Sequence, residues 1–187
     1  FEKFPSFSIL EDVYPWDLSE IYNPPVLLFY KGNLDLLKLP KVAVVGSRNS
    51  SRVGSQSVQK IIKELNNELV IVSGLARGID TSAHMAALQN GGRTIAVIGT
   101  GLDVFYPRAN KKLQSYLGEH HLVLSEYGPE AEPLKFHFPE RNRIIAGLCR
   151  GVIVAEAKIR SGSLITCERA MEEGRDVFAI PGSILEG

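Results

Sequence analysis

Short runs of apolar, mostly β-branched residues recur along the chain, and most of them end in Gly, Ser or Pro. They are nearly continuous in hydrophobicity, which is typical of strands buried on both faces of a sheet. A further run at 26–33 ends in a Gly-Asn turn and predicts an additional strand. The core strands are predicted at residues 41–47, 69–74, 94–101, 121–128, 151–157 and 176–182.

Segments with helical periodicity lie between these runs. In the first of them, Val58, Ile61, Ile62 and Leu65 are spaced so that they share one helix face. The predicted helices span roughly 54–67, 79–90, 109–118, 139–150 and 163–173. Strands that alternate with helices favour an α/β fold with a doubly wound, mostly parallel sheet and right-handed crossovers.

Residues 1–40 differ from the rest of the chain because they are rich in aromatic residues and proline. They are too few to build a core of their own, so we expect an extension that packs on the sheet. Residues 41–187 then form the Rossmann-like core. The chain starts at Phe1 and stops just after Pro181, which suggests a part of a longer protein.

The formal net charge is +0 and the 187 residues fit a single domain, so any nucleic-acid function must rest on a local patch. Such a patch is present at 135–160, where six Lys and Arg face only Glu140 and Glu156. The basic residues flank the strand predicted at 151–157 and lie beyond strand ends, where open α/β sheets bind ligands. With Phe136, His137 and Phe138 beside them, they suit a polyanion with bases to stack, such as single-stranded nucleic acid.

Cysteine usage and hydropathy narrow the class of protein further. Cys149 and Cys167 are the two cysteines, and both fall in predicted helices without a CxxC motif. We interpret them as reduced, partly buried thiols of a cytosolic protein. No apolar run approaches the roughly 18 residues of a membrane span, and no signal peptide is recognised.

The first predicted strand ends in Gly46-Ser47-Arg48, ahead of a helix that starts near 51–55. Glycine lets the backbone approach an anion, amide groups at a helix start bind phosphate oxygens, and Arg48 adds a bidentate contact. The loop matches neither GxGxxG nor a P-loop. A tight turn with a solvated arginine remains an equally good interpretation.

Three further strand-end loops carry polar residues. In 73–84, Arg77 is a ligand contact, Asp80 caps a helix, and His84 is either part of a Ser/His/Asp triad or, better, a structural histidine. The GTG of 99–101 resembles the opening of a dinucleotide fingerprint but lacks its third glycine. Ser163, as the N-cap of a helix, would direct amide groups at the basic patch.

Asp103, Glu126 and Glu156 form a possible set of carboxylates on strand ends. Three carboxylates would tolerate Mg²⁺, but no histidine joins them at ligand spacing. We therefore favour salt bridges that orient the nearby arginines, and predict no metal site.

Taken together, these loops resemble DNA-processing protein A, the DprA/Smf family. The resemblance covers about residues 10–187 and rests on ordered motifs: GSR, SGLARGID followed by AH, GTGLDVFYP, SEYG, PLKFHFPERNRIIAGL, EAKIRSGSLIT and GRDVFAIPG. It implies a bacterial cytosolic protein with an extended Rossmann-like fold and a mixed sheet. It further implies a homodimer that binds single-stranded DNA and loads the recombinase RecA in natural transformation, without a catalytic step or cofactor.

The resemblance assigns the DNA-facing positions by motif. Gly46, Ser47 and Arg48 match the family's phosphate-facing loop, and the loop with Arg77 adds one contact. The remaining predicted DNA-facing residues are Lys135, Arg141, Asn142, Arg143, Lys158, Arg160, Ser161, Gly162 and Ser163. Glu140 is a local acid within this run and is interpreted as a surface variation.

Two alternative functions stay open at this point. Gly162 and Ser163, with Thr166 and Glu168, loosely resemble the loop of phosphoribohydrolases, which would make the chain a nucleotide-processing enzyme. The second alternative is a protein-interaction platform that uses the aromatic residues of 1–30. The concentration of lysine and arginine at strand ends argues against this alternative, because the cores of protein interfaces are depleted in lysine.

Overall fold

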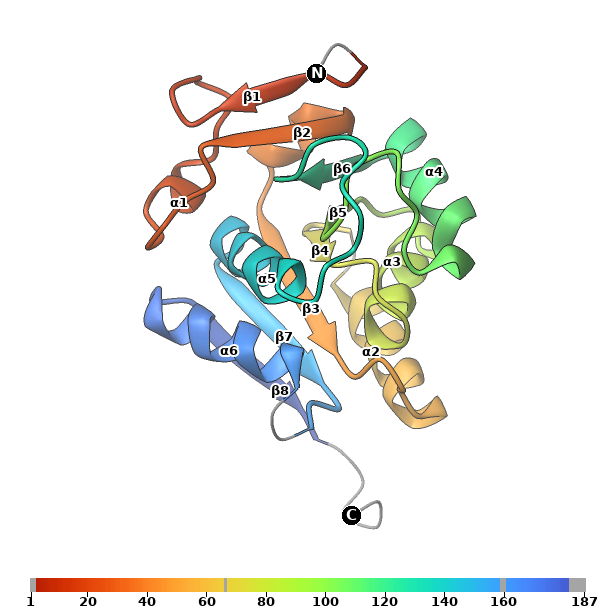
Figure 1. Ribbon diagram of the computed structural model, residues 1–187. Helices are drawn as coiled ribbons and strands as arrows, with labels where there is room; N and C mark the ends of the chain where they lie inside the picture. Colours follow the sequence, from red (N-terminus) through yellow and green to blue (C-terminus); the bar gives the residue numbers. More distant parts are fainter. Residues whose placement is uncertain (1–2, 66, 159–160, 182–187) are drawn as a thin grey trace.

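A computed structural model describes residues 3–65, 67–158 and 161–181. They form one sheet of eight strands in the order β1-β2-β6-β5-β4-β3-β7-β8 (Figure 1). The strands are β1 Ser6–Ser8, β2 Leu27–Gly32, β3 Lys41–Gly46, β4 Val70–Ser73, β5 Thr94–Ile98, β6 Leu122–Ser125, β7 Gly151–Ala155 and β8 Asp176–Ile180. Neighbours from β6 to β8 are parallel, whereas β1 and β2 are antiparallel additions. The predicted doubly wound, mixed sheet is confirmed.

Helices cover both faces of this sheet (Figure 1). They are α1 Trp16–Ser19, α2 Arg52–Glu64, α3 Ile79–Gln89, α4 Lys111–His120, α5 His137–Leu148 and α6 Gly162–Glu172, with short 3₁₀ helices η1 Leu34–Lys38 and η2 Arg108–Asn110. The helices α2, α3 and α4 pack on one face, and α1, α5 and α6 on the other. Every predicted helix is present, with ends shifted by at most three residues.

The core explains why the strand runs are continuous in hydrophobicity. Every residue of β4, β5 and β6 is buried, because helices cover both faces of these strands. On one face, Val58 and Ile62 of α2 pack with Val42 and Val44 of β3. Strands buried on both faces do not show the alternation of hydrophobic and polar residues that is typical of strands with one exposed face.

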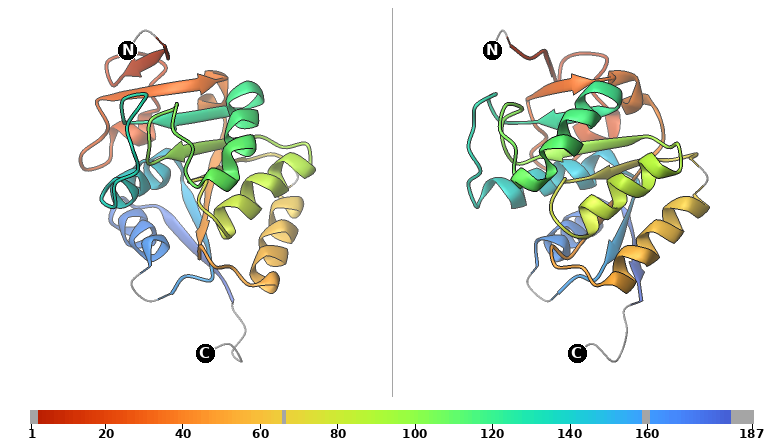
Figure 2. Two further views of the ribbon diagram at one scale, coloured as in Figure 1. Left: turned by 45° about the vertical axis from the view of Figure 1, so that its right-hand side comes forward. Right: turned by 90° about the vertical axis from the view of Figure 1, so that its right-hand side faces the viewer.

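The N-terminal region extends the sheet at its edge. β2 pairs antiparallel with β6, and β1 pairs with β2. The views in Figure 1 and Figure 2 place β1, in red, and β8, in blue, at opposite ends of the molecule. β1 and α1 are not predicted from the sequence because three or four residues carry no readable periodicity. The boundary at residue 40 stays a prediction.

The strand order creates a topological switch point between β3 and β7. From β3 the chain moves outward through β4, β5 and β6, and α5 then returns it to β7 on the other side of β3. The loops that leave β3 and β7 therefore diverge to opposite faces. Ligands of open α/β sheets bind in the crevice that such a divergence leaves.

The two cysteines lie in the interior of the protein. Cys149 and Cys167 are both buried and free, and burial raises the pKa of each thiol. Cys149 follows the last residue of α5 and serves as its C-cap, whereas Cys167 lies in α6. Among the described residues, no helix is long and apolar enough to cross a bilayer.

Candidate nucleic-acid interface

The switch-point cavity, which we define as the space between the loops after β3 and β7 and the starts of α5 and α6, has a volume of about 460 Å³. Most of the predicted DNA-facing residues line it: Gly46, Ser47, Arg48, Lys135, Arg141, Asn142, Lys158, Ser161, Gly162 and Ser163. These residues come from segments more than 100 positions apart in the chain. Folding therefore concentrates them at the place predicted from the strand ends.

A second, larger space adjoins it. The loop cavity, lined mainly by the loop that follows β5, has a volume of about 1240 Å³. It holds the predicted contact Arg77 together with Phe105, Tyr106, Arg108 and Lys111. The two cavities share the lining residues Arg48, Asn49, Ala76, Phe138 and Arg141. They consequently form a continuous basic and aromatic surface along the carboxyl edge of the sheet.

Phe138 stands where the two cavities meet, and it is only partly buried. Two guanidinium groups lie against its ring: the Cζ of Arg48 is 5.3 Å from the ring centroid and the Cζ of Arg141 is 5.5 Å away. Gly99 borders the ring so closely that a Cβ there would lie 2.9 Å from it. A partly exposed aromatic ring beside cations is the kind of surface on which nucleic-acid bases stack.

His137 fixes the start of α5 next to this ring. Its side chain is buried, its Nδ1 donates to the Gly99 carbonyl at 3.0 Å, and its ring stacks on Tyr127 with centroids 3.8 Å apart. The neighbouring Phe136 is 58% exposed. Of the three residues 136–138, His137 is thus a structural support, whereas Phe138 lines both cavities.

Arg141 is an interior cation. It is 4% exposed, and its Nη1 donates to the carbonyls of Gly74 at 2.7 Å and Val97 at 2.8 Å. Its Nε donates to Asn142 Oδ1 at 3.0 Å. Burial lowers the pKa of this guanidinium to about 10, and the nearby Asp80 carboxylate opposes that shift. Arg141 therefore borders the cavities while its Nη1 and Nε groups donate to protein acceptors.

Arg143 is also held by protein groups. Its Nη1 and Nη2 donate to the two carboxylate oxygens of Glu126 at 2.8 and 2.6 Å, and its Nε donates to the carbonyl of Asn23. It is not among the described residues that line either cavity. The predicted salt bridge that orients an arginine is confirmed for Glu126. The predicted contact of Arg143 with DNA stays a prediction, without geometric support from the cavities.

The other two strand-end carboxylates have different partners. Asp103 forms an ion pair with Lys3 at 2.8 Å. Glu156 accepts hydrogen bonds from the amide and the hydroxyl of Ser51, at the start of α2. Within the described residues, no group of three or more His, Cys, Asp or Glu side chains is arranged to hold a metal ion.

Gly46, the last residue of β3, is a glycine for a reason other than a ligand. A Cβ at Gly46 would lie 2.1 Å from the carbonyl oxygen of Ala155 in β7. Ser47 is buried and its Oγ accepts from the amide of Asn49 at 3.1 Å. Arg48 is exposed, so it presents its charge to both cavities.

The start of α6 corrects one expectation. Ser161, rather than Ser163, is the N-cap, and its Oγ accepts from the amide of Leu164 at 3.3 Å. The prediction that Ser163 caps this helix is wrong because Gly162 already has helical geometry. The Oγ atoms of Ser161 and Ser163 lie 2.9 Å apart. Lys158 is exposed beside them, and Arg160 lies outside the described residues.

The triad at 80–84 is not formed. The Nδ1 of His84 hydrogen-bonds to Thr94 Oγ1 at 2.6 Å, and burial lowers the pKa of this imidazole to about 3. Asp80 lies in the first turn of α3 and accepts from the amides of Gly74 and Ala76, while the N-cap position is Gly78. The structural interpretation of His84 is confirmed, with a strand residue as its partner.

Sequence reasoning missed the basic side of the loop cavity. Arg108 and Lys111 follow the GTG loop by several residues and lie in or next to η2. The available signal was a cluster of basic residues at 108–112 after a strand-end loop. In a segment predicted to be helical, such a cluster does not by itself distinguish a ligand contact from a solvated helix face.

Comparison with known proteins agrees with this geometry. Residues 6–187 match the family model described as DNA recombination-mediator protein A. The chain is 83% identical over 187 residues to DNA processing protein DprA of Streptococcus pneumoniae, covering 100% of this chain and 66% of that protein. It is 50% identical over 175 residues to DNA processing protein DprA of Bacillus subtilis, covering 92% of this chain and 59% of that protein.

Solved structures show the same fold. A solved structure of DNA processing protein A from Helicobacter pylori, which concerns its single-stranded DNA binding mode, matches with a TM-score of 0.86 at 32% identity, covering 97% of this chain and 83% of that one. The X-ray structure of the Streptococcus pneumoniae protein matches with a TM-score of 0.98, covering 100% of this chain and 66% of that one. The chain thus spans two thirds or less of the curated relatives above. The resemblance seen in its motifs is confirmed, and the chain belongs to the DNA recombination-mediator protein A family.

Proposed function

We propose that this chain binds single-stranded DNA along the joined switch-point and loop cavities. The observation that carries the proposal is the position of Phe138, a partly exposed ring between two basic cavities at the topological switch point. A base stacks on this ring, and the backbone phosphates on either side contact the exposed cations. The described cations that line these cavities and are exposed include Arg48, Lys135, Arg108, Lys111 and Lys158.

Single strands suit this surface better than a duplex. Stacking on Phe138 needs a base whose face is free, and in a duplex both faces are covered by neighbouring base pairs. The Helicobacter pylori relative, whose structure concerns single-stranded DNA binding, supports the same ligand class.

The biological role extends this binding activity. In the proposal, a homodimer in the bacterial cytoplasm holds incoming single-stranded DNA during natural transformation and loads RecA onto it. Family membership as a recombination mediator supports this role. No catalytic step is part of the proposal, since a mediator acts by holding and transferring its ligand.

Fluorescence anisotropy of a labelled oligo-dT of about 20 nucleotides, at several salt concentrations, tests the proposal. We expect binding that weakens with salt and resists a duplex competitor. With about five cations engaged, log K should fall with log salt at a slope of about −3.5. Absence of binding at low salt contradicts the proposal. Release of free base from a nucleoside monophosphate would instead support the nucleotide-processing alternative.

A further inference from the structure

Tyr106 is a large aromatic side chain that lines the loop cavity and is 47% exposed. A single exposed aromatic residue is common on a protein surface and needs no ligand to explain it. Tyr106 is different because it borders Phe138: the two ring centroids are 5.6 Å apart and the rings are inclined at 41°. Both rings line the loop cavity, so they form one aromatic wall with two inclined faces.

The distance between the two rings decides how bases can use them. A base inserted between two rings needs two van der Waals contacts of about 3.5 Å, or about 7 Å between the rings. The observed 5.6 Å is too short, so each ring has to take a base of its own. Stacked neighbours along one strand are about 3.4 Å apart, and an unstacked strand separates them further. The rings are therefore spaced for neighbouring nucleotides, and their inclination fits bases that are not stacked on each other.

The volume of the loop cavity supports the same interpretation. Pockets that hold one drug-sized ligand have volumes of about 300–1,000 Å³. The switch-point cavity, at about 460 Å³, lies in this range, whereas the loop cavity has about 1240 Å³. One base on Phe138 does not fill that volume, and the face of Tyr106 is open to a second nucleotide.

The charges of the loop cavity suit the backbone of a second nucleotide. Five of the described residues that line it are lysine or arginine, and two are acidic. One of the two acids, Asp103, is already paired with Lys3. Arg108 and Lys111 are exposed and follow Tyr106 closely in the chain. A nucleotide that stacks on Tyr106 therefore has cations beside it for its phosphates.

The loop between β5 and η2, which carries this tyrosine, is held in place by hydrogen bonds. The carbonyl oxygen of Val104 accepts from Thr100 Oγ1 and from Gln114 Nε2, both at 3.2 Å. The amide of Asp103 donates to the carbonyl of Pro129 at 2.9 Å, which ties the loop to the segment after β6. A loop that is already ordered loses little conformational freedom when a ligand binds, so more of the stacking energy contributes to affinity.

We propose that Tyr106 is a second base-stacking residue, which extends the DNA path from Phe138 across the loop cavity and holds the neighbouring nucleotide of the same strand. The inference rests on the proposed function, since it concerns the same ligand. The two rings together need two adjacent bases whose faces are free. They therefore select an unpaired strand, while stacking itself tolerates any base.

Anisotropy titrations with two single strands of about 20 nucleotides test the inference: oligo-dT, and an oligomer of abasic sites that has the same phosphates. We expect Tyr106→Ala to bind oligo-dT about tenfold more weakly than the parent, and Tyr106→Phe to bind like the parent because it keeps the ring. The deficit of Tyr106→Ala should vanish on the abasic oligomer, which has no bases to stack. Its slope of log K against log salt should equal that of the parent, because stacking releases no counterions.

Tyr116→Ala is the matched control for the loss of an exposed tyrosine. Tyr116 is also 47% exposed, but it lies in α4 and is not among the described residues that line the cavities. We expect this variant to bind both oligomers like the parent.

Two results overturn the inference while the parent binds oligo-dT. One is a folded Tyr106→Ala protein, judged by its thermal melt, that binds oligo-dT as tightly as the parent. The other is a deficit of equal size on the abasic oligomer, which would mean that the substitution disturbs the loop and its cations. If Tyr106→Ala does not fold, Tyr106→Leu, which also lacks a ring, decides by the same criteria. Absence of oligo-dT binding by the parent contradicts the proposed function, and this inference with it.

Discussion

Two arginines lie against the ring of Phe138, but they differ in burial and in hydrogen-bond partners. Arg48 and Arg141 each place a guanidinium within 5.5 Å of the Phe138 centroid. Arg48 is exposed, whereas Arg141 is 4% exposed and donates to the carbonyls of Gly74 and Val97. The basic segments thus contain both buried cations that are held by protein groups and exposed cations that line the cavities. Arg143, which is paired with Glu126, is of the first kind.

The largest expected effect comes from removing the interior cation. Arg141→Met leaves the buried Asp80 carboxylate without the nearby positive charge that opposes its desolvation and removes the donors to the carbonyls of Gly74 and Val97. An uncompensated buried charge costs about 3–5 kcal/mol of unfolding free energy. Chemical denaturation measures this loss. Arg48→Ala, at the exposed partner position, should change stability little. Equal stability of the two variants would remove the distinction between them.

The same variant should have an altered pH dependence. Burial raises the pKa of Asp80, and Arg141 opposes that rise, so Arg141→Met raises the folded-state pKa further. An acid whose folded-state pKa is raised binds its proton more readily when folded, so stability increases as the pH falls through the folded-state pKa toward the ordinary pKa of the unfolded chain. We expect the stability gap to the parent to be full at high pH and to narrow as the pH falls toward the ordinary range of an aspartic acid. A stability gap that is constant with pH would show that the ionised Asp80 does not cause the loss of stability. If Asp80 does cause it, the double variant Arg141→Met with Asp80→Asn should be more stable than Arg141→Met alone.

The next effect concerns the ring itself. Phe138→Ala should weaken oligo-dT binding by ten- to a hundredfold, since stacking of a base on an aromatic side chain contributes about 1–3 kcal/mol. Phe136→Ala is the control, because Phe136 is exposed but is not among the described residues lining the cavities. Anisotropy titrations compare the two. Similar losses in both would indicate that binding depends on general hydrophobicity of the segment.

Removal of the exposed Arg48 side chain should have the next largest effect on DNA binding. Arg48→Ala should cut oligo-dT affinity by about tenfold, given about 1–2 kcal/mol for a lost charge-assisted contact. Arg93→Ala is the matched control: Arg93 is exposed and precedes β5, at the opposite edge of the sheet. Unchanged affinity in Arg48→Ala with an intact fold would contradict its place in the interface.

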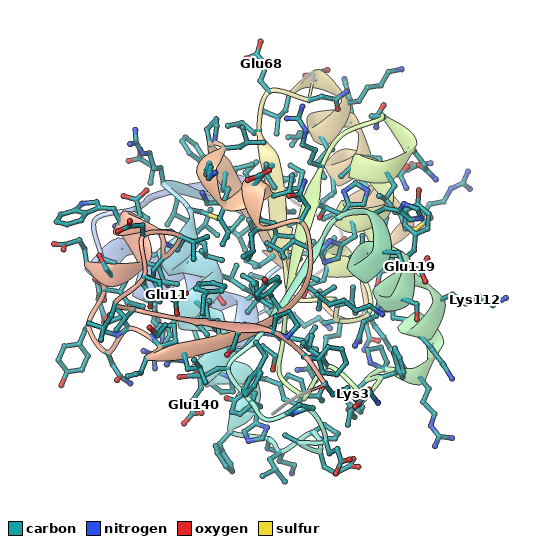
Figure 3. All side chains as sticks on the ribbon, turned by 90° about the horizontal axis from the view of Figure 1, so that it is seen from above. Lys3, Glu11, Glu68, Lys112, Glu119 and Glu140 are labelled. Atoms are coloured by element: carbon teal, nitrogen blue, oxygen red, sulfur yellow. The ribbon has the colours of Figure 1, made fainter. Side chains whose placement is uncertain are left out.

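The smallest expected effect is that of Lys158, and it tests whether this exposed lysine contacts a phosphate of the bound DNA. Lys158→Ala should lower the slope of log K against log salt by about 0.7, the value for one phosphate contact on a single strand. Lys112→Ala, whose side chain projects from the periphery in Figure 3, should leave that slope unchanged. If both variants have the parent slope, Lys158 contacts no phosphate.

The fold was predictable because its strands are buried on both sides. Continuous apolar runs in β4, β5 and β6 have few interpretations other than a covered parallel sheet. β1 and α1 could not be predicted because they have only three and four residues, too few for a readable periodicity. β1 forms through its pairing with β2, which is a tertiary contact. The position of the site also followed from sequence, because parallel strands place all their carboxyl ends at one edge.

The chain's local patterns were enough to predict the fold class, the edge of the sheet that carries the candidate site and the residue types available there. Which of these residues line the cavities with exposed charges depends on the tertiary structure. Arg141 and Arg143 have the same chemistry as Arg48, but desolvation at their positions demands partners, and Asp80, Glu126 and backbone carbonyls provide them. Glu156 similarly occupies the start of α2 because folding brings it beside a residue 105 positions away. Burial and pairing are properties of long-range contacts, which no local pattern of residues encodes.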